Sequence, residues 1–495
     1  MANATGSTTG TGYVASELSR ETNWWGAFVV GLAGTILITG VTGPVLGALG
    51  SAALPQFFFW TVTGGLLCLF LAEMATMLPD RTGGAPAYAF FAFQERFPRA
   101  MPHINGVTLW MYWLGWCPVM AVNMILTGAY LPTLLHITDR TPTINLVGYP
   151  VSLFTLGVGA VLSVGLFIPA YLGIRFGTVF ATILGLLSMI PLTLLAILPL
   201  VRPSTMDLAN VWPFQTPDGA PLFSAHSLYL ALQFSALYTW NVIAMEAAAC
   251  YLAECRTPER DAPIAMALEG GYGVFLYTVL PFSFLAVLGQ RNISADPLAL
   301  FSTFAGRVVD IPLINELVTL MLLIALALSS LNAIMGCARS LYQMALDGQC
   351  PRILAHVNRH NVPDVAMALN TVLNIALILF GAPAVIYVFS NVGYVGSFVP
   401  VLLGYYFLRR WKPELHRPFK LPGWMRYVAL AQAFLYFVVW AFGIPTCALE
   451  GCVAGGLPAW ILGLVVVAAY FPLYWWRRRE DRRRAPELGS VQAAP

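Results

Sequence analysis

The stretch Trp24–Ser51, WWGAFVVGLAGTILITGVTGPVLGALGS, decides the fold class. It is long and apolar enough to cross the hydrocarbon core of a bilayer, which takes about 20 apolar residues as a helix. Its middle contains Gly40, Gly43 and Pro44, and proline both removes a backbone donor and clashes with the preceding turn. Since freed backbone groups in a membrane must find partners or line a cavity, we predict that Ile38–Gly43 is unwound and open to a ligand. A kinked, closely packed helix is the alternative.

The composition of the 495 residues is that of a membrane protein: 58% are hydrophobic and only 10% are charged, against about 25% charged residues in soluble domains. A soluble enzyme and a disordered scaffold are excluded. An outer-membrane barrel would need alternating polar residues toward its lumen, so we predict an all-α fold. About twelve spans are expected: 25–50, 56–78, 106–131, 150–170, 176–201, 227–254, 270–289, 313–341, 365–381, 383–408, 427–447 and 457–476.

Positive charge sets the expected orientation. With the N-terminus in the cytoplasm, only four of the 26 Lys and Arg residues lie outside, namely Arg140, Arg202, Arg291 and Arg307. The positive-inside rule therefore predicts a multi-pass protein of the cytoplasmic membrane with both termini in the cytoplasm. The tail WWRRREDRRR, 475–484, is interpreted as an anchor at anionic lipid and not as a nucleic-acid site. No signal peptide is expected in the polar segment 1–23.

The sixth span carries polar groups at mid-depth: Trp240, Asn241 and Glu246. An intramembrane carboxyl is costly unless it is paired, protonated or hydrated, so Glu246 is a functional candidate. A neutral acid bonded to a nearby carbonyl is the alternative. Near the cytoplasmic interface, we expect Glu254 to be solvated, and Glu73 to serve either structural pairing or transport. A broken first helix and a polar sixth helix, five spans apart, match transporters built from inverted repeats.

Four motifs then identify a resemblance. The first motif, at 73–88, is E-M-A-T-M-L-P followed by Gly83, Gly84 and Tyr88. The second is E-C-R-T-P-E-R-D-A-P at 254–263, and the third is A-R-S-L-Y-Q-M-A-L-D-G with Pro351 at 338–351. The fourth is R-P-F-K-L-P-G at 417–423. In this order, and after helices two, six, eight and ten, they resemble the loops of amino acid permeases of the amino acid–polyamine–organocation superfamily. The resemblance covers roughly Trp24 to Pro422.

The resemblance implies a LeuT-like, five-plus-five inverted repeat with discontinuous helices one and six, followed by two extra helices. The expected units are a cytoplasmic tail (1–23), a first repeat (24–201), a second repeat (227–408), helices eleven and twelve with their preceding loop (409–476) and a basic cytoplasmic tail (477–495). Sequence identity between the two halves is not sufficient to demonstrate the repeat.

The family's substrate site lies at the two discontinuous helices. Thr39-Gly40-Val41 is similar to its S-G-V/I segment, which implies that this backbone binds the ends of an amino acid or small amine. Trp240 and Glu246 have the spacing of the arginine/agmatine branch, where the tryptophan closes over substrate and the glutamate senses protons, and Tyr112 matches a gate tyrosine. The implied substrate-binding set is Ile38, Thr39, Gly40, Val41, Thr42, Trp240, Asn241, Val242 and Ala244.

Three departures limit the resemblance. Asn241–Ala244 has no glycine, so unwinding of helix six is less expected; Ala333 replaces a tryptophan that stacks on guanidinium, which argues against arginine; and Ser188 replaces a helix-five lysine. That last change leaves H⁺ and Na⁺ both open as coupling ions. Ser329 and Ser330 are candidate Na⁺ ligands, and hydroxyls bonded to their own helix are the alternative.

The implied function is secondary active transport by alternating access, proton-coupled or exchanging, and not enzymatic catalysis. A transporter-like sensor would need a large cytoplasmic domain, and a membrane enzyme would need a catalytic cluster. His356 and His360 have metal-compatible spacing without a third ligand, so we expect no metal and no cofactor. The sequence leaves open a homodimer, and either a disulfide or two thiols at Cys447 and Cys452.

Overall fold

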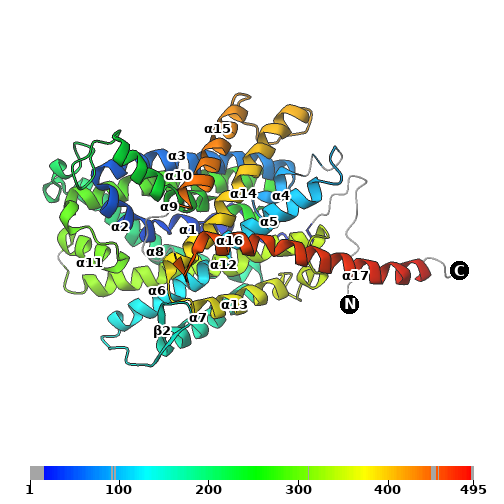
Figure 1. Ribbon diagram of the computed structural model, residues 1–495, viewed down its shortest axis with the longest axis horizontal. Helices are drawn as coiled ribbons and strands as arrows, with labels where there is room; N and C mark the ends of the chain where they lie inside the picture. The colour runs from blue at the N-terminus through cyan, green and yellow to red at the C-terminus, as the bar shows by residue number, and fades with distance from the viewer. Residues whose placement is uncertain are drawn as a thin grey trace.

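The computed structural model describes residues 16–90, 93, 96–309, 311–446, 453–454 and 456–491. Within these residues the fold is a helical bundle with two small antiparallel hairpins (Figure 1). The α-helices are α1 (Trp24–Thr35), α2 (Ile38–Leu49), α3 (Ala53–Met77), α4 (Pro86–Ala89), α5 (Met101–Trp116), α6 (Val119–Leu134), α7 (Leu153–Tyr171), α8 (Ile174–Val201), α9 (Ala225–Ile243), α10 (Pro258–Leu288), α11 (Pro297–Val308), α12 (Ile314–Leu346), α13 (Asp364–Ile378), α14 (Pro383–Trp411), α15 (Met425–Val438), α16 (Ala459–Ala468) and α17 (Tyr470–Val491).

Shorter elements connect or extend these helices. The 3₁₀ segments are η1 (Gly50–Ala52), η3 (Pro203–Thr205), η4 (Leu208–Asn210), η5 (Ala244–Glu254), η6 (Gln290–Asn292) and η7 (Arg352–Ala355), and η8 (Val439–Gly443) is a π turn. The hairpins pair β1 (Thr143–Asn145) with β2 (Pro150–Ser152), and β3 (Val453–Ala454) with β4 (Leu457–Pro458). The disulfide considered for Cys447 and Cys452 falls outside the described residues.

Ten stretches of the described chain are long and apolar enough to cross a membrane, against the twelve expected. The first two expected spans form one helical stretch, Trp24–Met77, and Asp364–Ile378 is a shorter apolar helix. As one straight rod, Trp24–Met77 would be about 80 Å long, far more than a bilayer needs. The chain changes direction at Gly50, whose φ of +58° is accessible to glycine without steric cost.

The centre of the bundle contains the first helix. Every residue from Val29 to Thr35 is buried, and α1 packs against α8, α10, α12 and η5. The periphery is also apolar, but its side chains are exposed: Val161 on α7 is 71% exposed and Leu194 on α8 is 61% exposed. Such side chains suit contact with lipid tails, which are as apolar as they are.

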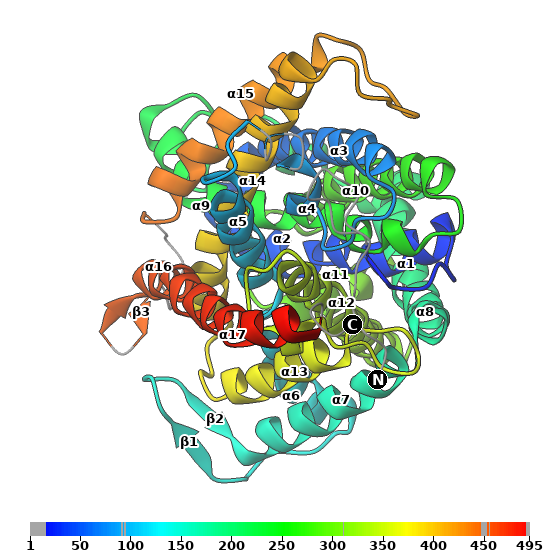
Figure 2. The same ribbon diagram turned by 90° about the vertical axis from the view of Figure 1, so that its right-hand side faces the viewer.

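Both ends of the described chain meet the last turns of α12. The Tyr342 hydroxyl accepts a hydrogen bond from the Glu17 N–H (3.2 Å), and the Arg477 guanidinium donates to the Ala345 carbonyl (2.7 Å). Figure 2 views the molecule from the end toward which α17 extends in Figure 1. In this view α15 lies at the upper edge and the β1–β2 hairpin at the lower edge. The two ends of the described chain therefore lie on the same side of the bundle.

Candidate functional site

Helix one is interrupted at Ile36 and Leu37, between α1 and α2. The Ile36 carbonyl accepts both the N–H and the hydroxyl of Thr39, at 3.1 and 3.0 Å. The Thr42 hydroxyl donates to the Ile38 carbonyl at 2.8 Å. These local bonds let the helix resume at once, so Ile38–Gly43 is helical. The prediction that Ile38–Gly43 is unwound is therefore wrong, since the helix is interrupted by the turn at Ile36–Leu37, where the backbone keeps right-handed helical dihedral angles.

Helix six changes type where a gap was expected. α9 continues directly into the 3₁₀ segment η5 at Ala244. Hydrogen bonds within a 3₁₀ helix have poorer geometry than in an α-helix, and side chains from elsewhere donate to the η5 carbonyls. These donors are Cys68 to Met245 (3.4 Å), Thr82 to Cys250 (3.2 Å) and Tyr88 to Ala249 (3.0 Å). Without a glycine in Asn241–Ala244, the helix narrows and does not unwind.

The two irregular points touch each other. A Cβ placed on Gly34 of α1 would overlap the carbonyl oxygen of Ala244. Backbone therefore lies on backbone where α1 approaches its end and where α9 becomes η5. Only glycine permits this approach at position 34, because any side chain would push helix one away from helix six.

Glu246, on the first turn of η5, is fully buried and collects three donors on one oxygen. Its Oε1 accepts from the hydroxyls of Tyr112 (2.8 Å) and Tyr394 (2.7 Å) and from the indole N–H of Trp116 (3.1 Å). Its Oε2 has no hydrogen-bond partner in the described part of the chain. The structure thus brings together two of the predicted gating residues, Glu246 and Tyr112, and adds two aromatic donors.

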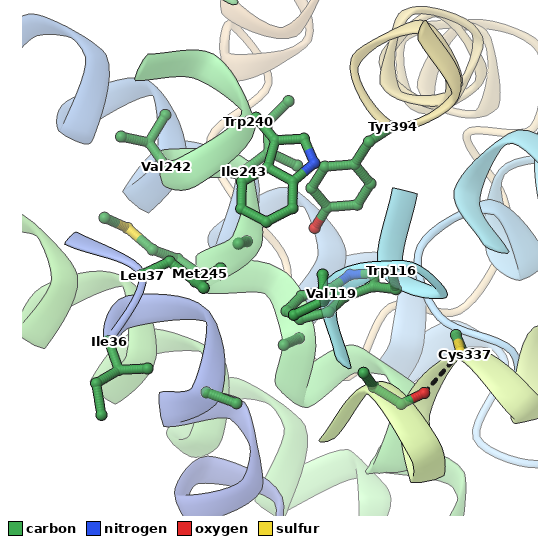
Figure 3. Packing of buried hydrophobic residues seen from close by; sticks show 14 of the residues in the cluster. Ile36, Leu37, Trp116, Val119, Trp240, Val242, Ile243, Met245, Cys337 and Tyr394 are labelled. Carbon is green, nitrogen blue, oxygen red and sulfur yellow. Dashed lines mark hydrogen bonds between the residues drawn. The ribbon is translucent and has the colours of Figure 1, made fainter. Parts of the chain in front are cut away.

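Trp240 lies one turn and a half before Glu246 and faces the same space. Its ring packs edge-on against Tyr387 (centroids 4.7 Å apart) and lies 6.0 Å from that of Tyr394. Figure 3 shows Trp240 and Tyr394 projecting toward each other from different helices, with Trp116 beyond the tyrosine hydroxyl. The adjoining hollow is lined by Trp240, Tyr387, Ser390 and Val119, among others, and is too narrow for a water molecule. The site is closed in this conformation.

Of the predicted substrate-binding residues, Trp240 is the one that lines this closed hollow. Gly40 lies next to Tyr387, since a Cβ there would meet only the Tyr387 hydroxyl, at 3.6 Å. Asn241 bonds to its own helix through Nδ2 and the Leu237 carbonyl (2.7 Å). The Val242 carbonyl lies against Gly64 of α3. The remaining members are buried, Ala244 at the backbone contact with Gly34 and the others on α2: Ile38, Thr39, Val41 and Thr42.

The two serines of helix eight differ from each other. Ser330 donates to the Leu326 carbonyl (2.8 Å) and accepts from Asn123 (3.2 Å), so it follows the alternative of bonding to its own helix. Ser329 is buried and its hydroxyl has no partner among the described residues. Its role as an ion ligand stays a prediction.

Two acidic residues near the side where the chain ends meet are structural. Glu254, expected to be solvated, is buried and forms a two-bond ion pair with Arg339, one of whose bonds measures 2.8 Å. That expectation was wrong because Arg339 of α12 reaches the end of η5. Glu73 pairs with Arg409 (Nε–Oε1 2.9 Å) and lies 3.2 Å from Arg417. The Glu254–Arg339 pair joins the second and third sequence motifs, and the Glu73–Arg417 pair joins the first and the fourth.

Sequence reasoning missed three residues of the site, Trp116, Tyr387 and Tyr394, and one buried acid outside it, Glu269. The aromatic residues come from spans whose facing was not predicted. Glu269 is fully buried on α10 and accepts a hydrogen bond from Thr35, the last residue of α1, at 3.0 Å. The expected span began at residue 270, whereas α10 begins at Pro258, so Glu269 fell one residue outside the expected span. Its signal was an acid directly beside Gly270-Gly271.

Comparison with known proteins agrees with this geometry. A family model described as amino acid permease matches residues 23–467. An uncharacterized amino acid permease of Bacillus subtilis, YvbW, is 20% identical over 425 residues, covering 84% of this chain and 89% of the relative. A probable GABA permease of Pseudomonas aeruginosa is 24% identical over 429 residues, 84% of each chain. A glutamate/gamma-aminobutyrate antiporter of Lactococcus lactis is 24% identical over 192 residues, 36% of this chain and 38% of the relative.

The family match spans nearly the whole chain, and these relatives are transporters, not enzymes. The helices long enough to cross a membrane, the interrupted helix one and the ordered loop motifs agree with it. The chain therefore belongs to the amino acid permease family of membrane transporters.

Proposed function

We propose that this permease moves an amino acid or a related small amine across the cytoplasmic membrane by alternating access. The observation that carries the proposal is the contact between the interruption of helix one and the change of helix type in helix six, beside a closed hollow under Trp240 and Tyr387. Discontinuous helices at mid-membrane are where transporters of this architecture bind their substrates.

The two helix ends suit the two ends of a zwitterion. In the closed conformation the Thr39 and Gly40 N–H groups bond to the Ile36 and Leu37 carbonyls, at 3.1 and 3.0 Å. Opening of this turn would free N–H groups at the positive end of the α2 dipole, which favour a carboxylate, and carbonyls that can accept from an ammonium group. Trp240 and Tyr387 would then cover the bound molecule. Because two relatives are described by GABA or glutamate, these two compounds are the first substrates to test, with neutral amino acids beside them.

We assign coupling to Glu246. A carboxyl buried in a membrane helix is stable when it is protonated or fully bonded, and its three donors come from α5 and α14, helices that must move relative to η5 for the site to open. Gain or loss of one proton would then favour one conformation. Exchange of two substrates uses the same site. Na⁺ at Ser329 and Ser330 is the competing assignment.

The proposed architecture has twelve crossings, counting α1–α2 and α3 separately and including α13, with units 24–201 and 227–408 as inverted repeats. Both chain ends would lie in the cytoplasm. A homodimer and association with anionic lipid through 477–484 stay predictions.

Counterflow in proteoliposomes tests the function. Liposomes loaded with an unlabelled amino acid should accumulate the labelled compound, with no energy source, if the protein exchanges substrate. We expect Trp240→Ala to reduce the initial rate about tenfold, the effect of roughly 1.4 kcal/mol of lost binding. Trp424→Ala, at a position 61% exposed, is the matched control and should keep the rate. Absence of counterflow for the whole substrate panel would contradict the proposal.

The same vesicles separate the two coupling ions. With Glu246→Gln, we expect uptake to lose its dependence on an imposed pH gradient while counterflow persists, because exchange needs no net proton movement. If uptake instead follows a Na⁺ gradient and is lost in Ser329→Ala, the ion site belongs to helix eight.

A further inference from the structure

A second carboxyl lies fully buried at the helix-one interruption. Glu269, on α10, accepts a hydrogen bond from the Thr35 hydroxyl to its Oε1 at 3.0 Å. Its Oε2 has no hydrogen-bond partner in the described part of the chain. Thr35 is the last residue of α1 before Ile36–Leu37. Glu269 therefore contacts the end of α1 from outside the substrate hollow.

The Glu269 carboxyl occupies the space that Gly31, which has no side chain, leaves on helix one. A Cβ on Gly31 would lie 2.8 Å from Glu269 Oε2 and 2.9 Å from the Ala248 Cβ of η5. Glu269 is thus enclosed by α1 and η5 as well as by its own helix. No room is left for a hydration shell while α1 stays in place.

No positive charge compensates this carboxyl. Among the described ion pairs none includes Glu269, whereas Glu73 and Glu254 each pair with arginine. The titratable groups near enough to act on Glu269 are all acids: Cys68 on α3, Glu246 on η5, and Tyr272 and Tyr277 on α10. α1 has no titratable side chain, and that of α8 is Arg175 in its first turn. An anion here would face other acids without a cation.

Of the two buried carboxyls, Glu269 is less stabilised as an anion than Glu246. Glu246 has three donors on one oxygen, and Glu269 has one. Each hydrogen bond to a charged group contributes stabilisation, and a buried charge without enough of them costs several kcal/mol. A bound proton removes that cost for Glu269 and leaves the Thr35 bond intact.

We propose that Glu269 is a second proton-binding site, and that its bound proton keeps α1 seated against α10 and η5. On release of the proton, the carboxylate needs water, and water reaches it only if α1 moves away at Thr35 and Gly31. Release of the proton and opening of helix one are then one event. This inference rests on the proposed transport function and adds a proton site distinct from Glu246.

Infrared difference spectroscopy on the purified full-length protein tests the proton directly, without any substrate. At neutral pH the wild type should show a protonated-carboxyl C=O band that shifts in D₂O. The Glu246→Gln background removes any contribution from that carboxyl, and there the band should remain. Adding Glu269→Gln, which preserves the shape of the neutral acid, should remove it. Persistence of the band in the double variant would overturn the proposal, and so would loss of the band from the wild type when Na⁺ is added at constant pH, since that result identifies a cation site.

Two further measurements keep this inference separable from the proposed function. Thr35→Val, which lacks the hydroxyl, should increase the reactivity of a cysteine introduced at Gly40 toward a thiol reagent. Thr35→Ser, which keeps the hydroxyl, should not. Equal reactivity in the two variants would contradict the proposed role of the Glu269–Thr35 bond in seating α1. Thermal-shift binding of GABA, glutamate and neutral amino acids should persist in Glu269→Gln. If no amino acid binds even the wild type, the transport proposal fails while the infrared result still decides the proton site. If binding persists but the Glu269 band is absent, only the present inference fails.

Discussion

At the scale of single residues, the bundle handles its buried acids in two ways. Glu254 and Glu73 are neutralised by arginines that lie 85 and 336 positions away in the sequence. Glu246 and Glu269 have no ion pair among the described residues and rely on hydroxyl and indole donors. The paired acids fasten the layer where the chain ends meet, and the unpaired acids lie beside the two irregular helices. Pairing therefore separates structural acids from those available for proton binding.

The Glu254–Arg339 pair supplies a stability prediction. Glu254→Gln leaves the Arg339 guanidinium buried without a counter-charge, which costs roughly 3–5 kcal/mol. Asp80→Asn is the matched control, because its pair with Arg20 is 40% and 50% exposed on the two sides and such pairs contribute about 1 kcal/mol or less. Thermal unfolding of the detergent-purified variants measures both. Equal melting temperatures for the two variants would contradict a structural role for the buried pair.

The sequence identifies some site residues and misses others for physical reasons. Glu246 and Trp240 stand out because a carboxyl inside an apolar span is costly and because their spacing is specific. Tyr394 and Trp116 look like ordinary membrane aromatics, and only the packing of α5 against α14 shows that they converge on Glu246. Glu254 was assigned to solvent because sequence does not reveal that Arg339 reaches it.

At the scale of elements, the join between helices one and six depends on glycine. Gly34→Ala should separate α1 from η5, because the added methyl group overlaps the Ala244 carbonyl, and overpacking of this kind costs roughly 1–3 kcal/mol. Gly47→Ala on α2 is the control, since a Cβ there meets nothing within 4 Å. We expect a lower melting temperature and slower counterflow for Gly34→Ala, and neither change for Gly47→Ala. A Gly34→Ala protein with unaltered transport would show that the contact is not required.

Elements were predicted better in place than in number or internal detail. Apolar length locates most spans, because crossing a bilayer imposes that length. The interruption of helix one was recognised from Gly40 and Pro44 but lies at Ile36–Leu37, where the threonine hydroxyls decide which carbonyls are satisfied. The 3₁₀ form of η5 depends on donors from Cys68, Thr82 and Tyr88, and no local pattern encodes such distant bonds.

At the scale of the whole molecule, the shared side of the two chain ends gives a topology prediction. In a background with Cys447 and Cys452 changed to serine, a cysteine at Asn145 in the exposed β1 strand should react with a membrane-impermeant reagent in intact cells. A cysteine at Arg478 of α17 should react only after permeabilisation. The six described native cysteines are buried and should give little background. Reaction in the reverse order would invert the proposed orientation.

The pairing of Glu73 with Arg409 also has a consequence for biosynthesis. The two residues are 336 positions apart, so at about 5–20 residues per second the ribosome delivers the arginine roughly 17–67 s after the acid. During that interval the nascent second helix must keep its carboxyl hydrated at the bilayer surface or neutral within it. Until α14 and the loop behind it are synthesised, this acid lacks Arg409 and Arg417 as partners, so we expect a polypeptide truncated before Arg409 to be degraded faster in cells than the full chain.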